Sequence, residues 1–521
     1  MTLEAPPVAA PGPVPGGLVP LPREVVTEDG PAFALTAGCT VGGDETAVGV
    51  LTALVSARTQ GSIALQRVAT GPRILLATTD AAAAESYTLT VSDAGVAVVG
   101  ADPAGLFYGI QSLAQLIEPA ADGWRVPQVQ ITDAPRFSYR GVMLDVARHF
   151  FPVEVVLGVI DRASQLKLNR LHLHLTDDQG WRIALPSRAA LTERASATSV
   201  DGDAGGHYTG DDYSRIVAYA AERHMTVVPE IDLPGHTHAV GVAYPELAEP
   251  PVLSEHICEV VETYGSTLPV AGEPYEGIAV GFSSLRIGDP ATDAFVTDVV
   301  ADLAAMTPGP YLHLGGDEAL GTDPGAYAAF VALASRAVAE AGKTPVLWHE
   351  AGAASGLYPG SVGQYWGLLT PADGMDEKAR GFVSRGGRLI LSPADAVYLD
   401  MKDSADSELG LVWANGPTSV ERSYTWEPAT LLEGVAERDI LGVEAALWTE
   451  TVRRPEDIDL LMFPRIAAAA EAGWSPATGQ SPARTWESFR QRVGRLDGLW
   501  TALGIRFRRS PEIPWSGEEA R

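Results

Sequence analysis

In the first quarter of the chain, apolar positions alternate with polar ones in one segment and recur at helical spacing in the next. Residues 87–100, YTLTVSDAGVAVVG, contain two alternating runs joined by a turn with glycine, and this pattern predicts a β-hairpin. Residues 103–117, PAGLFYGIQSLAQLI, carry apolar side chains at helical spacing. The pattern changes after the proline of ITDAPRFSYRG at 131–141. We therefore predict a separate, non-catalytic α/β domain over residues 18–133.

From residue 140 onward, short apolar runs alternate with stretches of helical spacing. The apolar runs predict strands at 141–147, 170–176, 226–232, 311–316, 345–350, 361–366, 388–392 and 442–448. Helices are predicted between several of them, at 153–167, 211–224, 325–341 and 456–472. Eight strands in βα alternation predict an α/β fold, a (β/α)8 TIM barrel over residues 134–505 that follows the small α/β domain.

A doubly wound open sheet is the alternative fold. That fold usually carries a glycine-rich phosphate loop after its first strand. Here the first strand runs into LDVARHF at 144–150, which is not such a loop. The barrel is therefore the preferred interpretation.

The two ends of the chain read as tails. Residues 1–17 are rich in proline and alanine and predict a disordered segment, and residues 506–521 are expected to form a C-terminal tail. The N-terminus lacks the basic region and apolar core of a secretory signal. We expect a cytoplasmic protein, or a secreted one if a signal had been removed.

Composition and charge narrow the class of partner. The 521 residues are 46% hydrophobic and 20% charged, which is ordinary for a soluble globular protein, and the formal net charge is −29. This charge argues against nucleic acid and anionic lipid as partners. An apolar stretch of 18 residues is absent from the sequence, so we expect no membrane span. Cys39 and Cys258 lie far apart and suggest neither a metal site nor a disulfide framework.

Polar and aromatic residues follow most of the predicted barrel strands. In a TIM barrel the carboxyl ends of the strands form the active-site face. Each such residue alone could be structural, but their occurrence after so many strands predicts a site there. The residues are Arg148, His149, Asp177, Asp178, His236, Asp317, Glu318, His349, Glu350, Trp366, Trp448 and Glu450.

The stretch YLHLGGDEAL at 311–320 places two acids where a buried strand ends. Asp317 could cap the next helix, and Glu318 could favour its dipole. The two preceding glycines instead permit a sharp bend or a close approach to a ligand. An acid pair among many tryptophans suggests glycoside hydrolysis, whose usual retaining form needs two carboxyl groups about 5–5.5 Å apart. Adjacent strand residues point to opposite faces, so these two fit poorly as nucleophile and acid.

The motifs together resemble a known family. GVMLDVARHFFP, NRLHLHLTDDQGWR, PEIDLPGHTHA, HLGGDE, QYWG and ALWTE are similar to family 20 of the glycoside hydrolases, the β-N-acetylhexosaminidases, and most similar to its bacterial chitobiase-like members. The resemblance runs from about residue 18 to 505. It implies an exo-acting, retaining enzyme that removes terminal non-reducing N-acetyl-hexosamine. Family 20 is a substrate-assisted exception to the two-carboxylate rule.

The resemblance also implies how the acids divide the reaction. The carbonyl oxygen of the substrate's 2-acetamido group attacks the anomeric carbon and gives an oxazolinium intermediate. Glu318 is expected to be the general acid and then the base. Asp317 is expected to hold the acetamido N–H and offset its growing positive charge, and Tyr398 to donate to the acetamido oxygen. Asp177 is expected to orient His236 toward Glu318.

The remaining implied positions bind the sugar. Trp348, Trp366 and Trp448 would wall the acetamido methyl, with core packing as the alternative reading, and Trp413 would line the aglycone side. Arg148 would bind the 3- and 4-hydroxyls, Asp400 the 4-hydroxyl, and Glu450 the 4- and 6-hydroxyls. The expected partners are therefore N-acetylhexosamine-terminated oligosaccharides, with glucosamine and galactosamine epimers both open.

Neither a cofactor nor a metal is expected. A metal interpretation of His172, His174, His236 and His238 is weak, because 172 and 174 lie in an alternating strand and the sequence has no HExxH-type helix. Asp403 departs from the family pattern, since many relatives have an aromatic residue there, which puts the packing of that loop and the aglycone preference in doubt.

Two rival functions stay open. One is a carbohydrate-binding protein on a degenerate barrel, against which the intact Asp317, Glu318 and Tyr398 speak. The other is an enzyme that removes a disaccharide, as lacto-N-biosidases do. That activity needs an open pocket, whereas Arg148, Asp400 and Glu450 predict a closed one.

Overall fold

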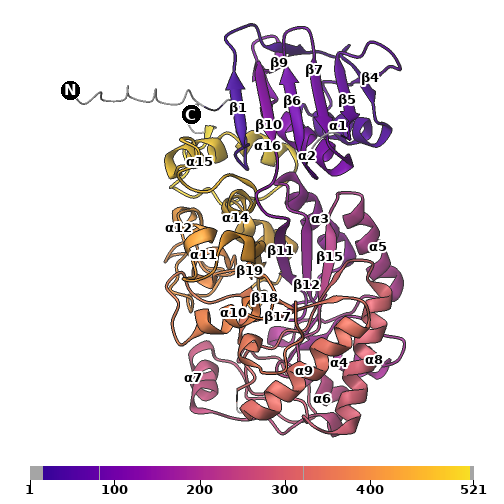
Figure 1. Cartoon of the computed structure of the whole chain (residues 1–521), viewed down its shortest axis with the longest axis vertical. Helices are drawn as coiled ribbons and strands as arrows, with labels where there is room; N and C mark the ends of the chain where they lie inside the picture. Colours follow the sequence, from indigo (N-terminus) through magenta and orange to yellow (C-terminus); the bar gives the residue numbers. More distant parts are fainter. Residues whose placement is uncertain (1–13, 15, 81–82, 321, 517–521) are drawn as a thin grey trace, which may run out of the picture. The chain divides into compact units, whose positions relative to one another are not determined.

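The computed structural model describes residues 14, 16–80, 83–320 and 322–516, which divide into two compact units (Figure 1). The first comprises residues 1–136, 165–167 and 470–521, and the second comprises residues 137–164 and 168–469. The predicted barrel ran to residue 505, but the structure groups residues 470–505 with the first unit. The predicted tail at 1–17 lies outside the described residues except for 14, 16 and 17.

The predicted C-terminal tail is packed over its described part. Ile513 and Trp515 are buried. The Phe507 ring lies 5.3 Å from the Trp500 ring and 4.9 Å from the Trp515 ring, measured between centroids. Burial of these large apolar side chains removes them from water, which is the physical reason that residues 506–516 do not form a loose tail.

The first unit contains a seven-stranded sheet in the order β1-β10-β6-β7-β5-β3-β4 and a three-stranded sheet in the order β2-β9-β8. The predicted hairpin is present as the antiparallel pair β6 and β7. The strands are β1 (Glu24–Thr27), β2 (Phe33–Leu35), β3 (Thr40–Gly43), β4 (Gln66–Arg67), β5 (Ile74–Thr78), β6 (Tyr87–Val91), β7 (Val96–Gly100), β8 (Glu118–Ala120), β9 (Gly123–Val126) and β10 (Val129–Asp133).

The first two helices of this unit begin at side-chain caps. In α2 (Pro103–Leu116) the Asp102 carboxylate accepts from the Gly105 N–H, and proline occupies the first position. α1 (Glu45–Arg58) is capped by Asp44. The C-terminal helices are α15 (Trp486–Gly494) and α16 (Asp497–Ala502). The unit boundary falls inside α14 (Arg465–Trp474).

The second unit is a closed barrel of eight parallel strands, ordered β11-β12-β15-β16-β17-β18-β19-β20. This arrangement is the predicted (β/α)8 architecture, and the eight barrel strands overlap the eight predicted ones. Their bounds are β11 (Tyr139–Asp145), β12 (Arg170–His174), β15 (Thr226–Glu230), β16 (Tyr311–His313), β17 (Thr344–Trp348), β18 (Val362–Tyr365), β19 (Leu389–Leu391) and β20 (Ile440–Leu447).

Helices surround these strands (Figure 1). The predicted helix at 456–472 is two helices, because proline at position 464 lacks the N–H that would continue the ladder. Within the described part of the chain, no helix has the length and apolar character needed to cross a bilayer. The helices are α3 (Val153–Gln165), α4 (Ala190–Ala195), α5 (Gly210–Ala221), α6 (His238–Ala243), α7 (Glu255–Tyr264), α8 (Pro290–Met306), α9 (Pro324–Glu340), α10 (Met375–Val383), α11 (Ala394–Val397), α12 (Val420–Tyr424) and α13 (Pro455–Met462).

The barrel interior holds two apolar clusters and a set of buried polar side chains. One apolar cluster contains Tyr139, Val228, Val346, Val362, Ile390 and Leu441. The other contains Met143, Trp348, Ala394, Tyr398, Met401, Ala414, Ala446 and Trp448, and it includes residues that follow the strands. The strands also carry the buried polar residues His172, His174, Glu230, His313, Gln364 and Glu444.

Candidate active site

The segment after β16 turns sharply because of its two glycines. Gly315 and Gly316 have φ values of +64° and +97°, in the region that favours glycine. A Cβ on Gly315 would lie 1.7 Å from Oδ1 of Asp232, so a side chain cannot be accommodated there. The Gly316 N–H donates to the same oxygen over 3.0 Å. The glycines therefore let the chain pass against Asp232 and deliver Asp317 and Glu318 to the end of the barrel.

Two of the predicted catalytic residues have strained backbones. Glu318 has φ +45° and His236 has φ +53°, although neither is glycine. Such conformations cost on the order of 1–3 kcal/mol each and persist where the surrounding structure enforces them. The strain lies at the two residues whose side chains meet, which is typical of a functional site.

The His236 side chain lies between Asp177 and the acid pair and contacts both. His236 Nδ1 lies 3.2 Å from Asp177 Oδ1. On its other side, His236 Nε2 lies 3.4 Å from Glu318 Oε2 and 3.8 Å from Asp317 Oδ2. The Glu318 side chain is 32% exposed and that of Asp317 is 11% exposed. The more open Glu318 can therefore exchange protons with substrate and water, while Asp317 is enclosed.

Burial and neighbouring charges set the protonation of this group. Burial opposes charge on His236, but Asp177, Asp232 and Asp317 raise its pKa well above its usual range. Burial likewise opposes charge on Asp177, yet Arg148 and His236 hold its pKa well below the ordinary value. Burial raises the pKa of Asp317 to about 6, against the attraction of His236. At neutral pH the site thus contains an imidazolium between carboxylates.

A cavity of about 420 Å³ opens in front of the acid pair. Asp317 and Glu318 line it, together with six of the predicted substrate-binding or catalytic residues: Trp366, Tyr398, Asp400, Trp413, Trp448 and Glu450. Both oxygens of Asp400, Oε2 of Glu450 and Oδ1 of Asp317 are buried without a hydrogen-bond partner. Since unpartnered buried acceptors are costly, this end of the cavity suits a ligand that brings several O–H or N–H donors.

The aromatic side chains of the cavity contact one another. The Tyr398 ring centroid lies 5.8 Å from that of Trp413 and 6.1 Å from that of Trp448. Trp366 lies 6.1 Å from Trp413. Trp348, predicted to wall the same space, is fully buried and packs behind, with its ring 6.1 Å from Trp448. Trp348 therefore packs against the aromatic side chains of the cavity but does not line the cavity itself.

Arg148 lies beside Asp177 and Trp448, where it pairs with carboxylates. Its Nη2 lies 2.9 Å from Asp177 Oδ2, and its Nη1 lies 3.5 Å from Asp145 Oδ2. The guanidinium stacks 4.8 Å from the Trp448 ring centroid. Arg148 thus lies at the site and forms ion pairs with two carboxylates. Its buried Nε has no hydrogen-bond partner among the described residues.

A buried ionic network lies beneath the catalytic group and was not predicted. His174 joins Glu230 (2.5 Å) to Asp177 (2.8 Å). His172 joins Glu230 (3.1 Å) to Glu444 (2.8 Å). Despite burial, these carboxylates raise the pKa of His172 to about 10 and of His174 to about 9. The alternation of RLHLH places both histidines on one face, and that was the available signal.

The four histidines of the weak metal interpretation are held by hydrogen bonds and ion pairs within the protein. His172 and His174 contact carboxylates as described, and His236 contacts Asp177. His238 instead has its Nε2 2.7 Å from the Glu273 carbonyl oxygen. His172, His174 and His236 thus belong to one network joined by Glu230 and Asp177, and the His238 side chain has a different partner.

Two further acids at the site were not singled out as ligands. Asp232 contacts the glycine turn, and burial and Asp317 raise its pKa well above the ordinary value. Glu350 lies with both carboxyl oxygens 3.1 Å from Trp366 Nε1, and burial and Asp317 raise its pKa to about 8. In the sequence, only the position of these two acids after a barrel strand could have indicated their place at the site. Asp403, the departure from the family pattern, is half-buried.

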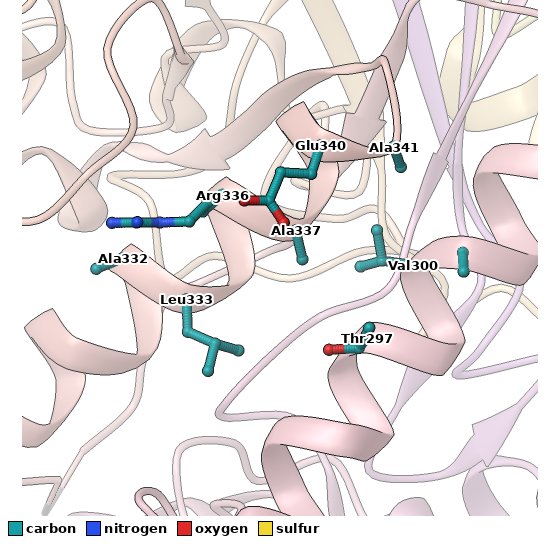
Figure 2. A pocket seen from close by; sticks show the side chains of 9 residues that line it. Thr297, Val300, Ala332, Leu333, Arg336, Ala337, Glu340 and Ala341 are labelled. Carbon is teal, nitrogen blue, oxygen red and sulfur yellow. The ribbon is translucent and has the colours of Figure 1, made fainter.

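A second hollow, of about 550 Å³, lies between α8 and α9 (Figure 2). Its lining is mostly apolar, from residues such as Val300, Leu333 and Ala337, with Arg336 and Glu340 as its charged members. Figure 2 shows the apolar side chains of the two helices facing this space. The acid pair lines the other cavity, so the candidate chemistry belongs there.

Comparisons with known proteins agree with this geometry. Residues 137–325 and 320–477 match the model of the catalytic domain of glycosyl hydrolase family 20, and residues 16–134 match the model of domain 2 of that family. The chain is 39% identical over 513 residues to a β-N-acetylhexosaminidase of Cellulomonas fimi, covering 96% of this chain and 97% of the relative.

Solved structures resemble the chain over nearly its whole length. A glycoside hydrolase family 20 β-N-acetylglucosaminidase is 58% identical with a TM-score of 0.88, covering 97% of this chain and 100% of the other. The N-acetyl-β-hexosaminidase of Streptomyces plicatus, solved in complex with Thio-NAglucal, is 40% identical with a TM-score of 0.87, covering 97% and 99%.

Proposed function

The chain belongs to glycosyl hydrolase family 20, and from that membership we propose how its own residues carry out the family's reaction. The enzyme is an exo-acting, retaining β-N-acetylhexosaminidase that works by substrate assistance through an oxazolinium intermediate. We further propose that its substrates are oligosaccharides that end in N-acetylhexosamine. The observation that carries the assignment of residues is the cavity in which two consecutive acids face an aromatic box.

Asp317 is assigned to the acetamido group of the substrate. Its carboxylate is enclosed, and its buried Oδ1 lacks a hydrogen-bond partner, so an N–H donor from the substrate would satisfy it. As the acetamido oxygen attacks the anomeric carbon, positive charge grows on the acetamido group, and the anion of Asp317 offsets that charge. Tyr398, which lines the same cavity, donates to the acetamido oxygen and orients it.

Glu318 is assigned to proton transfer. It protonates the leaving oxygen in the first step and removes a proton from water in the second. The contact with His236, itself held by Asp177, supplies an adjacent positive charge that keeps the Glu318 carboxylate in place. The two adjacent acids thus act on different parts of the substrate in the same step: Asp317 on the acetamido group and Glu318 on the leaving oxygen.

Asp400 and Glu450 are assigned to the hydroxyls of the terminal sugar. Their buried oxygens are acceptors without donors in the protein, and hydroxyl groups are donors of the required kind. Trp366 and Trp448 wall the acetamido methyl, and Trp348 supports them from behind. Arg148 fixes Asp177 and Trp448, and its assignment to the 3- and 4-hydroxyls rests on family membership.

Inhibition by a thiazoline analogue of the oxazolinium tests these roles. The analogue should compete with substrate and bind far more tightly than free N-acetylglucosamine, because it resembles the intermediate. Asp317→Asn should weaken both thiazoline binding and hydrolysis, since the amide cannot offset positive charge. Unchanged thiazoline affinity in Asp317→Asn, in a variant that keeps its unfolding temperature, would contradict the assignment of Asp317.

A further inference from the structure

The first unit contains a cavity that has no part in the proposed reaction. Its volume is about 560 Å³, and among the described residues it shares none with the lining of the catalytic cavity. The end of α1, strand β9 and helix α16 border it, and α1 and α16 contact each other (Figure 1). We call this space the first-unit cavity. Its charged, amide and aromatic lining residues include Arg58, Gln60, Glu118, Trp124, Arg495 and Asp497.

Arg58, the last residue of α1, is held in this cavity by one nitrogen. Its Nε donates to the Ile117 carbonyl over 3.1 Å, and its guanidinium carbon lies 5.5 Å from the centroid of the Trp124 ring. The guanidinium also lies against α16, because a Cβ on Gly498 would be 2.8 Å from Nη1. Nη1 and Nη2 donate to no acceptor among the described residues. Arg58 therefore keeps two donor groups for a ligand.

Charged groups of both signs line the first-unit cavity. Arg58 and Arg495 lie there with Glu118 and Asp497, so a small anion would meet carboxylates and a cation would meet guanidinium groups. Glu118 Oε1 pairs with Arg125 over 2.7 Å, while its Oε2 accepts no hydrogen bond from the described residues. Burial lowers the pKa of Arg58 against the attraction of Asp497, so this guanidinium gains from an added acceptor. The lining thus suits a neutral ligand that has both donors and acceptors.

Gln60 brings an amide to the cavity in a strained conformation. It is the second residue after α1 and has φ +51°, at a position where glycine is the usual residue. Within the described part of the chain, the Gln60 side chain has no hydrogen-bond partner. An amide supplies two donors and one acceptor, as a hydroxyl-rich ligand requires. Strain at a residue whose polar side chain is unengaged inside a cavity is typical of a binding site.

We propose that the first-unit cavity is a second, non-catalytic binding site for a neutral saccharide. A saccharide carries hydroxyl groups that would pair with Arg58, Gln60 and Glu118, and an apolar C–H face that would contact the Trp124 ring. The volume lies within the range of about 300–1,000 Å³ that is usual for small-ligand sites. The choice of an N-acetylglucosamine chain as this saccharide rests on the proposed function, and the chemistry of the cavity does not.

Calorimetric titration with the β-1,4-linked N-acetylglucosamine disaccharide tests this site separately from the catalytic one. The titrated protein carries Glu318→Gln, so that hydrolysis is slow, and saturating thiazoline fills the catalytic cavity. The titration should then show one further disaccharide bound per chain. Inorganic phosphate is the anion probe, and it should neither bind in place of the disaccharide nor weaken its binding.

Two substitutions locate the additional binding. Gln60→Gly and Arg58→Lys should each weaken it by about three- to tenfold, the loss expected from one or two hydrogen bonds. Gln60→Gly should also raise the unfolding temperature, because glycine relieves the positive φ. Matched controls are Asp373→Gly, at another exposed residue of positive φ, and Arg67→Lys, both outside the cavity lining. With Glu318 intact, all four variants should hydrolyse an aryl N-acetyl-β-glucosaminide like the parent enzyme.

Three results would overturn the inference. Absence of disaccharide binding in the presence of thiazoline would show that the cavity holds no saccharide. Binding of equal strength in the parent, Gln60→Gly and Arg58→Lys would place the second saccharide elsewhere. Phosphate that displaces the disaccharide would make the cavity an anion site. If the parent enzyme neither hydrolysed the aryl glycoside nor bound the thiazoline, the proposed function would fall, whereas disaccharide binding weakened by the two substitutions would still support the cavity as a saccharide site.

Discussion

The ionisation of Asp317 is the most specific property of a single residue in this site. Burial raises its pKa to about 6, and the proposed role requires the anion. Because the carboxyl is neutral below that pKa, kcat/KM should fall as the pH decreases through about 6. A pH profile of N-acetylglucosaminide hydrolysis measures this, and Asp317→Asn should be slow without that acidic limb. An acidic limb that persists unchanged in Asp317→Asn would assign it to another group.

Proton transfer by Glu318 predicts a loss that depends on the leaving group. Glu318→Gln keeps the shape and removes the acid, so hydrolysis of the disaccharide should fall by about 10²–10⁴-fold. Aryl substrates with very good leaving groups need less protonation and should lose less in the first step. Glu340→Gln, at the hollow beside α9, is the matched control. Equal losses for all leaving groups, with the first step rate-limiting, would contradict this role.

Comparison of Gly315 with Gly342 distinguishes backbone strain from steric collision as costs of adding a methyl group. Gly315 and Gly342 both have positive φ, but a Cβ on Gly315 would meet Asp232 at 1.7 Å, whereas one on Gly342 would have nothing within 4 Å. Gly342→Ala should therefore cost only about 1–2 kcal/mol of backbone strain. Gly315→Ala should in addition displace Asp232 or the acid pair, and with it activity. Thermal unfolding and hydrolysis of both variants would check this, and equal behaviour would contradict the collision.

At the scale of the elements, the strand-borne histidines predict how stability depends on pH. His172 and His174 have pKa values raised to about 10 and about 9 by carboxylates that outweigh burial. A raised pKa contributes stability that is complete below the unfolded value near 6.5 and is lost as the pH rises through the folded value. The free energy of unfolding should thus decline between about pH 6.5 and 10, by on the order of 3–5 kcal/mol per histidine.

Substitution of one histidine tests that source of stability. His174→Gln should lower stability at pH 6.5 and flatten its decline toward pH 9, while His256→Gln, on the exposed side of α7, should do neither. Denaturant unfolding at a series of pH values provides the measurement. A decline of the same slope in His174→Gln would show that other groups cause it.

The elements of the barrel were predictable because of how parallel strands are buried. Strands covered on both sides read as continuous apolar runs, and the glycine, proline and polar residues between them mark their ends. The acid pair, Trp366 and Trp448 were found because they follow such runs, whereas Tyr398, Trp348 and Trp413 were named from the resemblance to the family. The break at Pro464 was visible in the sequence but was read as part of one helix.

Other features depend on contacts that a local pattern cannot show. Apolar residues at helical spacing in α7 look like an ordinary core stripe, and only the fold reveals that Tyr264 faces the catalytic cavity. Likewise, RLHLH shows that His172 and His174 share a face, but the partners Glu230 and Glu444 come from β15 and β20, far away in sequence. The ion pair of Arg148 with Asp177 was not predicted for the same reason, and the contact of Arg148 with the sugar stays a prediction.

At the scale of the whole molecule, the first unit is built from both ends of the chain. Trp474 Nε1 donates to Asp133 over 3.0 Å, and the buried Glu471 accepts from the Leu21 N–H over 2.9 Å and from Arg492 over 2.7 Å. A chain that begins at residue 137 would keep Arg492 but lose Asp133 as partner of Trp474 and Leu21 as partner of Glu471. Truncation there should yield aggregated or poorly folded protein, as judged by gel filtration and thermal unfolding. A monomeric, cooperatively folding and fully active product would contradict this dependence.

Substrate assistance makes one demand that no enzymatic nucleophile would make. If the acetamido oxygen attacks the anomeric carbon, a sugar that lacks this group has no nucleophile, however well it binds. The direct measurement compares hydrolysis of an aryl N-acetyl-β-glucosaminide with that of the matching β-glucoside, which carries a 2-hydroxyl. The account predicts ready release of the aryl group from the first and negligible release from the second. Comparable hydrolysis of the glucoside, abolished by Glu318→Gln, would contradict it.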